Sequence, residues 1–355
     1  MKKILILTRF DTQGASSRYR FYQFIPYLKK NNFDVNISYL LSNNYLGYIY
    51  SGKKLKKNIS ILISYIKRII ILFKVKNYDL IWVEKENFPW IPFCIENYFI
   101  NKFPTYVIDF DDPIFHTYDQ YPNKFLRKIY KNKISKIMQS SNLVVAGNYY
   151  IANYAKRNGV KNVKVIPTVV NHEKYLSKSD NNHHPKFTIG WIGSPSTARH
   201  IQVAKEALIK ICSDSNVQFL VIGANSSDLN DIPAKIIPWL EETENSNLSK
   251  FDVGIMPLPD TPWERGKCGF KIIQYMASSI PVIASPVGIN NHIVDHGING
   301  FLAKDSSEWI KYIEILKNDS ELRISMGLAG QEKVKEKYSL SNIAPKISML
   351  LEKIR

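Results

Sequence analysis

Short apolar runs recur along the chain, and most are followed by a segment in which apolar residues are spaced three or four positions apart. The first run, at residues 3–9, is followed by a small-residue loop at 14–17 and a helical pattern at 18–30. A short apolar run is typical of a strand buried on both faces, whereas the wider spacing is typical of an amphipathic helix. Their alternation predicts a doubly wound α/β fold with a parallel sheet.

The alternation continues and then restarts at a second apolar run, residues 187–191, which also precedes a small-residue loop and a helix. Further strands are predicted at 35–40, 80–83, 105–108, 143–146, 163–166, 218–223, 236–239, 281–285 and 299–302. Further helices are predicted at 55–74, 124–139, from 148, and at 266–278, 306–318, 321–336 and 341–354. Because 355 residues exceed one ordinary core and the pattern occurs twice, we expect two domains.

The net charge is distributed unevenly. Residues 1–165 carry 27 Lys and Arg against 10 Asp and Glu, and residues 166–355 carry 21 of each, so the whole excess of +17 lies in the first half. Such a field favours an anionic partner, which could be a membrane surface, an anionic lipid or a nucleic acid. A surplus of solubilising lysines is the alternative.

Residues 53–76 combine this charge with isoleucines and leucines in an amphipathic pattern. Such a helix could lie on an anionic bilayer together with the basic segment at 127–136. An ordinary core-facing helix with a basic outer face is the alternative, and base rates favour it.

No apolar run reaches the ~18 residues of a membrane span. The first run ends at Leu7, before Arg9, as in a strand rather than a signal peptide.

The three cysteines are scattered along the chain. Their spacing is typical of neither a disulfide framework nor a zinc motif, and it predicts a reducing cytoplasm as the compartment.

Two lysines, Lys267 and Lys271, are four positions apart at the start of the helix predicted at 266–278, which Pro281 ends. Like charges at that spacing weaken a helix unless an anion lies nearby. Two solvated lysines are the alternative.

Small and polar residues follow the first strand of each half, at the edge where parallel sheets bind ligands. Ser194 is a credible N-cap before Pro195, which predicts a helix N-terminus with anion-binding amides. Candidate phosphate ligands are Gly193, Ser194, Ser196 and Thr197 in the second half, and Ser16, Ser17, Arg18 and Arg20 beside Gly14 in the first. For the first half, a capped helix with solvated arginines is the alternative.

Three carboxylates, Asp109, Asp111 and Asp112, follow the strand predicted at 105–108. Three acids within four residues of a basic chain require a chemical reason. They could bind sugar hydroxyls, hold a divalent metal or pair with Arg18.

The run QYMASSIPVIA at 274–284 resembles the segment EAMAsGxPVVas of retaining glycosyltransferases of family 4. Gln274 and Gly266 stand where that family has glutamates, with Glu264 two residues away. Three further segments are similar to the same family: DFDDPIF at 109–115, IPTVVN at 166–171 and NGFL at 299–302.

The resemblance implies the GT-B fold, in which two Rossmann-like doubly wound domains face an interdomain cleft. Residues 1–170 would be a basic acceptor-binding domain and 187–337 a nucleotide-sugar-binding domain, joined by a polar linker at 171–186. Residues 338–355 would form a final helix that crosses back to the first domain. His183 and His184 of the linker are expected to be loop residues rather than a metal site.

The resemblance also implies sugar transfer with retention of configuration from a UDP- or GDP-sugar, without a cofactor or a metal. Lys271 and Lys267 would stabilise the departing diphosphate. Asp111 and Asp112 replace a His-Asp pair of the family and would position the substrate. Donor contacts would be Gly14, Gly193, Ser194, Ser196, Thr197, Ile237, Trp239, Gly269, Phe270 and Gln274, and acceptor contacts would be Ser16, Ser17, Arg18 and Arg20.

The expected acceptor is a saccharide, lipid-linked or part of the cell envelope, because the basic first half favours an anionic membrane surface. A nucleotide-sugar epimerase of the same fold is the first alternative, although its motifs are not found. A Rossmann oxidoreductase is weaker because no GxGxxG follows either first strand. A nucleic-acid-binding protein would leave the phosphate-type residues of the second half unexplained, so no nucleic acid is expected as a partner.

Overall fold

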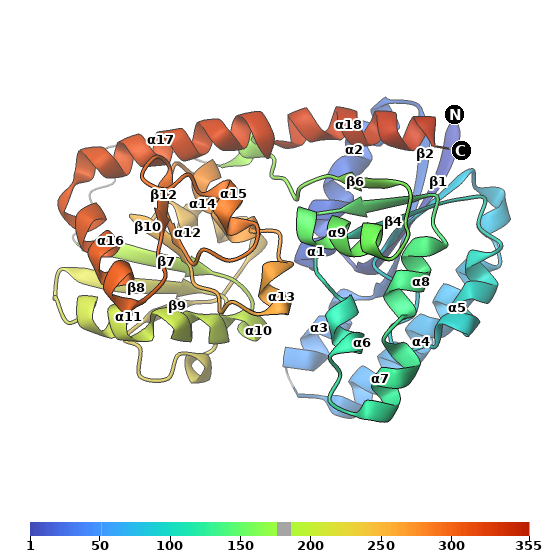
Figure 1. Cartoon of the computed structure of the whole chain (residues 1–355), viewed down its shortest axis with the longest axis horizontal. Helices are drawn as coiled ribbons and strands as arrows, with labels where there is room; N and C mark the ends of the chain where they lie inside the picture. Colours follow the sequence, from blue (N-terminus) through green and yellow to red (C-terminus); the bar gives the residue numbers. More distant parts are fainter. Residues whose placement is uncertain (51, 176–185, 355) are drawn as a thin grey trace. The chain divides into compact units, whose positions relative to one another are not determined.

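The computed structural model describes residues 1–50, 52–175 and 186–354. The chain divides into two units, which are described separately (Figure 1). The first comprises Met1–Thr168, Gly266–Cys268 and Ile343–Arg355, and the second comprises Val169–Arg265 and Gly269–Asn342. Each contains one six-stranded parallel sheet, which confirms the doubly wound α/β prediction. Most of the predicted linker, with His183 and His184, lies outside the described residues.

The sheet of the first unit has the strand order β2-β1-β3-β4-β5-β6. Its strands are β1 (Lys2–Phe10), β2 (Phe33–Leu41), β3 (Leu80–Glu84), β4 (Thr105–Phe110), β5 (Leu143–Ala146) and β6 (Val163–Val165). Consecutive residues of β1, such as Ile4, Leu5 and Ile6, are all buried. Because neighbouring side chains of a strand point to opposite faces, both faces of this sheet are covered.

Two of the helices that the sequence pattern predicts in the first unit are each divided into shorter ones, whereas the helix predicted at 55–74 agrees with α4 (Lys54–Leu72). The helices of this unit are α1 (Ala15–Arg20), α2 (Ile25–Lys30), α3 (Asn43–Tyr50), α4 (Lys54–Leu72), α5 (Phe93–Ile100), α6 (Phe115–Asp119), α7 (Lys124–Tyr130), α8 (Lys133–Gln139) and α9 (Tyr149–Arg157). The helix predicted at 18–30 is divided by a 3-10 turn, and α2 starts anew with Pro26 in its first turn, a position that needs no amide hydrogen. The helix predicted at 124–139 is two helices, because the backbone leaves the helical region at Asn132.

The sheet of the second unit has the order β12-β11-β10-β7-β8-β9. Its strands are β7 (Phe187–Ile192), β8 (Val217–Ile222), β9 (Lys235–Ile237), β10 (Val253–Met256), β11 (Val282–Ala284) and β12 (Gly300–Leu302). Its helices are α10 (Pro195–Ala198), α11 (Lys205–Ile211), α12 (Glu244–Leu248), α13 (Pro262–Arg265), α14 (Phe270–Ala277), α15 (Asn290–Ile293), α16 (Ser306–Asn318) and α17 (Ser320–Lys337). The last helix, α18 (Leu340–Lys353), runs from the second unit into the first, where Lys2 Nζ donates to Leu351 O at 2.8 Å.

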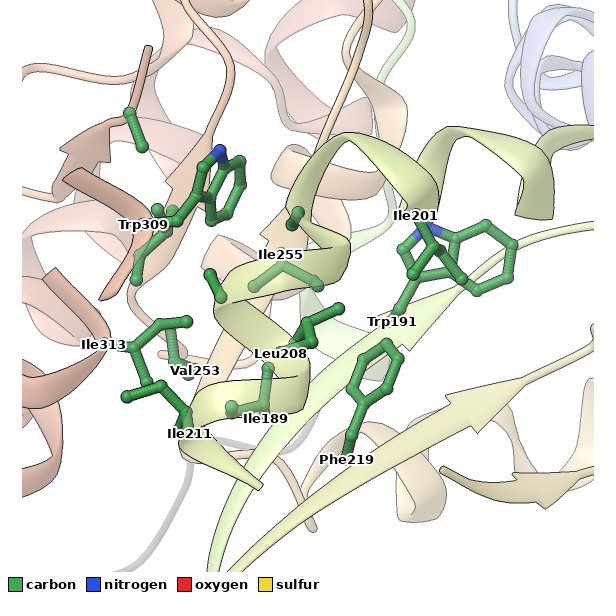
Figure 2. Packing of buried hydrophobic residues seen from close by; sticks show 14 of the residues in the cluster. Ile189, Trp191, Ile201, Leu208, Ile211, Phe219, Val253, Ile255, Trp309 and Ile313 are labelled. Carbon is green, nitrogen blue, oxygen red and sulfur yellow. The ribbon is translucent and has the colours of Figure 1, made fainter. Parts of the chain in front are cut away.

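Two large aromatic side chains anchor the core between the sheet of the second unit and its helices (Figure 2). Trp191 of β7 and Trp309 of α16 are each 1% exposed and pack with Leu208 of α11 and Ile255 of β10. Tight packing of this kind keeps the end of β7 rigid. The loop that follows β7 is therefore held in place by the core beneath it.

In both sheets the strand order reverses beside the first strand of the unit, so that this strand has neighbours from both halves of the sheet. β1 lies between β2 and β3, and β7 lies between β8 and β10. Ligands of open parallel sheets bind outside the carboxyl ends of the strands at such switch points. The candidate site residues are therefore those that follow β1 and β3 in the first unit, and β7 and β10 in the second.

Candidate active site

Lys271, in the first turn of α14, lies at the carboxyl end of β7. Its Nζ is 4.4 Å from the centre of the Trp191 ring and donates to Thr197 Oγ1 at 3.3 Å. An ammonium above an indole face is attracted by the negative charge of the ring surface. Trp191, which is fixed in the core shown in Figure 2, thus holds the positive charge at the predicted donor position.

Gly193 makes this arrangement sterically possible. A Cβ atom at this position would lie 2.7 Å from Lys271 Cε and 2.6 Å from the Cη2 atom of Trp191. Both distances are shorter than real Cβ contacts, so any larger residue would displace the lysine or the indole. The glycine predicted as a phosphate ligand therefore also determines where the ammonium lies.

Three hydroxyl groups lie in the same loop. Ser194 Oγ and Ser196 Oγ are 2.9 Å apart, and Thr197 Oγ1 donates to Ser194 O at 3.0 Å. The predicted helix N-terminus is weaker than expected, because α10 has only four residues and the Ser194 side chain makes no capping hydrogen bond. The amides of Gly193 and Thr197 already donate to Ile222 O and Ser194 O. The hydroxyl groups and the Lys271 ammonium, rather than these two amides, are therefore the candidate anion-binding groups of the loop.

The prediction that Lys267 and Lys271 share one helical face is wrong. Gly269 has a φ of 66° and is the N-cap of α14, so Lys267 precedes the helix. The left-handed conformation that glycine allows interrupts the helical hydrogen bonding at this point. Lys267 belongs by its contacts to the first unit, where Asn148 Nδ2 donates to the backbone oxygens of Gly266 at 2.7 Å and Lys267 at 3.1 Å.

Gln274 is buried, with 3% of its surface exposed, and its Nε2 donates to Glu244 Oε1 at 2.8 Å. The other oxygen of Glu244 accepts from Trp239 Nε1 at 2.6 Å. A glutamate at position 274 would place two carboxylates side by side, which costs free energy in a buried site. An amide at position 274, which can donate, therefore suits the neighbouring Glu244 better than a carboxylate would. Gln274 positions Glu244 and Trp239, while Ile237, Trp239 and Phe270 pack against the core.

In the first unit a buried lysine joins the two predicted catalytic carboxylates. Lys85 Nζ is 2.8 Å from Asp111 Oδ1 and 3.0 Å from Asp112 Oδ2. Ser16 Oγ donates to Asp111 Oδ2 at 2.5 Å and lies 3.3 Å from the same ammonium. Of the predicted acceptor ligands, Ser16 is thus beside the carboxylates. The ammonium occupies the place between the two acids that a divalent metal would need.

The charges of this cluster stabilise one another. Burial alone would raise the pKa of Asp111, but the Lys85 ammonium and hydrogen bonds from Lys85 and Ser16 outweigh burial and lower it. Burial likewise opposes the charge of Lys85, yet Asp111 and Asp112 raise its pKa above the ordinary value. Asp111 is therefore an ionised hydrogen-bond acceptor, because the ammonium and the hydrogen bonds outweigh the effect of burial.

Two of the predicted acceptor ligands have structural roles instead. Arg20 is 2% exposed and binds Asp109 through two hydrogen bonds of 2.9 Å, while its Nη1 donates to Ile166 O at 2.7 Å. Ser17 is fully buried and donates to Glu84 Oε2 at 2.6 Å. Both predictions were wrong, because the third and sixth residues of α1 face the sheet rather than its edge. Arg18 is half-buried with its guanidinium 4.8 Å from the Tyr19 ring. Gly14 is the N-cap of α1.

Lys85 is the site residue that sequence reasoning missed. It has a φ of 64°, which is rare for a residue with a side chain, and its amide donates to Asp109 O at 2.9 Å. The available signal was the charged triplet Glu84-Lys85-Glu86 directly after the apolar run at 80–83. Its importance became visible only with the sheet order, which places β3 beside β1 at the switch point.

Comparison with known proteins gives a consistent result. Residues 186–319 match the family model for glycosyl transferases group 1. Sucrose-phosphate synthase (tll1590) from Thermosynechococcus elongatus is 15% identical with a TM-score of 0.74, and 99% of each chain is covered. Anabaena HepE in complex with UDP-glucose is 16% identical, with a TM-score of 0.67 and 100% of each chain covered. The glycosyltransferase WaaG, involved in lipopolysaccharide biosynthesis, is 11% identical with a TM-score of 0.69, covering 98% of this chain and 99% of that one. No curated protein matches the chain.

The structural likeness extends over both units, and the family match lies in the second, where Lys271 and the loop after β7 form the candidate donor site. Both agree with the resemblance found at 274–284. Residues 186–319 are thus similar to group 1 glycosyl transferases, and the fold of the chain is the two-domain fold of the solved glycosyltransferases.

Proposed function

We propose that the protein transfers a sugar from a nucleotide-diphospho-sugar to a saccharide acceptor with retention of configuration. The second domain would bind the donor and the first the acceptor. The supporting observation is the Lys271 ammonium, held by Trp191 and Thr197 beside the hydroxyls of Ser194 and Ser196. A departing diphosphate gains negative charge, and fixed positive and hydrogen-bonding groups stabilise that charge.

In this proposal the leaving phosphate accepts the proton of the acceptor, and Asp111 and Asp112 bind sugar hydroxyl groups. A carboxylate held ionised by Lys85 is a good hydrogen-bond acceptor and a poor proton donor, which suits positioning rather than acid catalysis. Lys85 and Ser16 fix the direction of the Asp111 carboxylate. No cofactor and no metal is required by this chemistry.

We propose a UDP- or GDP-sugar as the donor and a lipid-linked or envelope saccharide as the acceptor. HepE has been crystallised with UDP and with UDP-glucose, and WaaG takes part in lipopolysaccharide biosynthesis. The basic first half is compatible with work at the cytoplasmic face of a membrane. The association that we propose is peripheral. None of the helices in the described part of the chain is long and apolar enough to cross a bilayer.

The test is a thermal-shift screen of nucleotide-sugars followed by a transfer assay with the best stabiliser. We expect stabilisation by one nucleotide-sugar and by its nucleoside diphosphate, and release of that diphosphate only when an acceptor is added. Rapid conversion of donor without acceptor would instead favour the epimerase. Stabilisation by oligonucleotides but by no nucleotide-sugar would contradict the proposal.

A further inference from the structure

The helix α4 presents an apolar stripe on its outer side. Six of its apolar residues are 47–74% exposed and follow one another at helical spacing along this side: Leu55, Ile59, Leu62, Ile63, Ile66 and Ile70, with Phe73 directly after the helix at 61%. We call these seven residues the α4 face. Isolated exposed leucines are ordinary, but a continuous apolar stripe over five turns marks an interaction surface.

The opposite side of α4 explains why the helix keeps this orientation. Arg68 is only 1% exposed, and its Nη2 donates to Thr8 O of β1 at 2.7 Å and to Ser38 O of β2 at 3.2 Å. Tyr65 donates to Pro89 O at 2.6 Å. Turning the apolar stripe inward would remove Arg68 from these strand carbonyls and expose Leu72, which is fully buried on the inner side. The α4 face is thus held outward by the contacts of the inner side, and the outer side is apolar as well as basic, unlike the purely basic outer face of the core-facing alternative.

The charge around the α4 face limits the kind of partner. Residues 53–76 contain eight Lys and Arg and no Asp or Glu. Beyond Phe73, Lys102 extends the surface, with its Nζ 5.4 Å from the Phe73 ring and 3.7 Å from the ring of Tyr98, which is 57% exposed. Figure 1 shows α4 and α5 side by side in the first unit. Apolar residues bordered by lysines and an exposed tyrosine are the composition of a bilayer interface, where aliphatic groups enter the lipid and ammonium groups reach the phosphates.

We propose that the α4 face docks on an anionic lipid bilayer, with the helix lying parallel to the membrane plane. This inference rests on the proposed function, whose lipid-linked acceptor would be met at such a surface. A second copy of the chain is a poorer partner, because two strongly positive faces would repel each other. A helix of 19 residues is about 28 Å long and so offers an extended line of contact.

The experiment is vesicle flotation of the full chain. We expect binding to phosphatidylcholine vesicles that contain about 40% phosphatidylglycerol, weak binding to phosphatidylcholine alone, and loss of binding in about 1 M salt. Leu62→Glu/Ile66→Glu should lower the vesicle partition coefficient by at least about tenfold, because two apolar contacts are lost and two negative charges are added. Both positions are exposed, so the fold should be kept, which circular dichroism checks.

The matched control is Ile324→Glu/Leu328→Glu, which places the same charges four positions apart on the exposed side of α17. This variant should bind vesicles like the wild type. Equal loss in both variants, or no binding of the wild type to anionic vesicles, overturns the inference. A dimer in light scattering that Leu62→Glu/Ile66→Glu dissociates would assign the face to protein association and overturn it as well.

Failure of this inference can be told apart from failure of the proposed function. Thermal stabilisation by the nucleotide-sugar and transfer to a water-soluble acceptor need no vesicles, and Leu62→Glu/Ile66→Glu should leave both unchanged. Transfer without vesicle binding would leave the function intact and remove only the docking surface. Vesicle binding without any stabilisation by a nucleotide-sugar would keep the docking surface and contradict the proposed function.

Discussion

The two units have sheets of similar design but opposite chemistry at their switch points. In the second unit the loop after β7 presents one ammonium, that of Lys271, among hydroxyl groups. In the first unit the residues after β3 and β4 form a closed cluster in which Lys85 is neutralised by Asp111 and Asp112. An ammonium among hydroxyl groups suits a diphosphate, whereas ionised acceptors held in place suit sugar hydroxyls. The comparison thus supports the proposal that the second unit binds the donor and the first recognises hydroxyl groups.

Lys271→Ala is expected to have the largest effect on activity. Removal of one preorganised group that stabilises a developing anion typically lowers kcat about 10²–10³-fold. The fold should be unchanged, because Lys271 is partly exposed and Trp191 stays packed. Steady-state kinetics and the melting temperature measure the two effects, with Lys210→Ala on α11 as the control. Wild-type turnover in Lys271→Ala would remove the donor assignment, and the contrast between the units with it.

Lys267→Ala sharpens the same prediction. Lys267 lies outside α14 and has no helical relation to Lys271, so we expect a smaller loss than for Lys271→Ala. Equal losses in the two variants would mean that both ammonium groups act on the diphosphate, as the sequence pattern alone implied.

Lys85→Met tests the first unit and should act on stability as well as on activity. Removal of one partner leaves Asp111 buried without the ammonium that contacts it, and breaking a buried pair typically costs about 3–5 kcal/mol of unfolding free energy. Lys128→Met, on the exposed side of α7, is the control and should change stability by less than about 0.5 kcal/mol. Chemical denaturation followed by circular dichroism measures the difference.

The pH dependence of the stability loss in Lys85→Met shows whether the variant loses an ion pair or packing. Because the pKa of Asp111 is lowered in the folded state, its stabilising contribution is present above the ordinary value of 3.8 and is lost as the pH falls further. In Lys85→Met burial raises the pKa of Asp111 above 3.8, so the penalty should shrink as the pH falls through that raised pKa and be smallest below pH 3.8. A penalty that persists undiminished in acid would indicate lost packing rather than a lost ion pair.

Much of this architecture could be predicted from the sequence because it depends on local patterns. The apolar runs at 80–83 and 143–146 coincide closely with β3 and β5. Lys271 was found because its neighbours at 274–284 carry a family pattern. What failed depends on three-dimensional packing: the break at Gly269 that separates Lys267 from the helix, and the burial of Arg20 against Asp109. Periodicity indicates that a residue is on a helix, but not whether a charged residue there meets a buried partner.

The same limit applies to Lys85 and to α4. A lysine that follows a strand is ordinary in a basic chain, and only the sheet order shows that it reaches the two acids after β4. The amphipathic pattern of α4 is compatible with either orientation, and the contacts of Arg68 with β1 and β2 decide between them.

Gly193→Ala is expected to have a moderate effect on the donor site. The new methyl group would lie 2.7 Å from Lys271 Cε, so the flexible lysine should move away from Trp191. We expect kcat/KM for the donor to fall about tenfold, as a displaced charge retains part of its interaction. Gly47→Ala in α3 is the control, because a Cβ there meets no atom within 4 Å. An unchanged kcat/KM would show that the position of Lys271 is not critical.

The smallest expected effect concerns the reactivity of Cys268, which lies beside the cluster of Lys85, Asp111 and Asp112. It involves no change in activity. Cys268 donates its thiol hydrogen to Asp111 O at 2.8 Å, and burial, together with the nearby Asp111 charge, raises its pKa to about 12. Since the thiolate is the reactive form, alkylation of Cys268 by iodoacetamide at about pH 8 should be slower by at least about 10³-fold than that of exposed Cys94. Peptide mass spectrometry over time measures both rates in one sample, and denaturant should make them similar. Comparable rates in the native protein would mean that residues 266–268 do not stay against the first unit in solution, and the closed cluster beside them would lose its support.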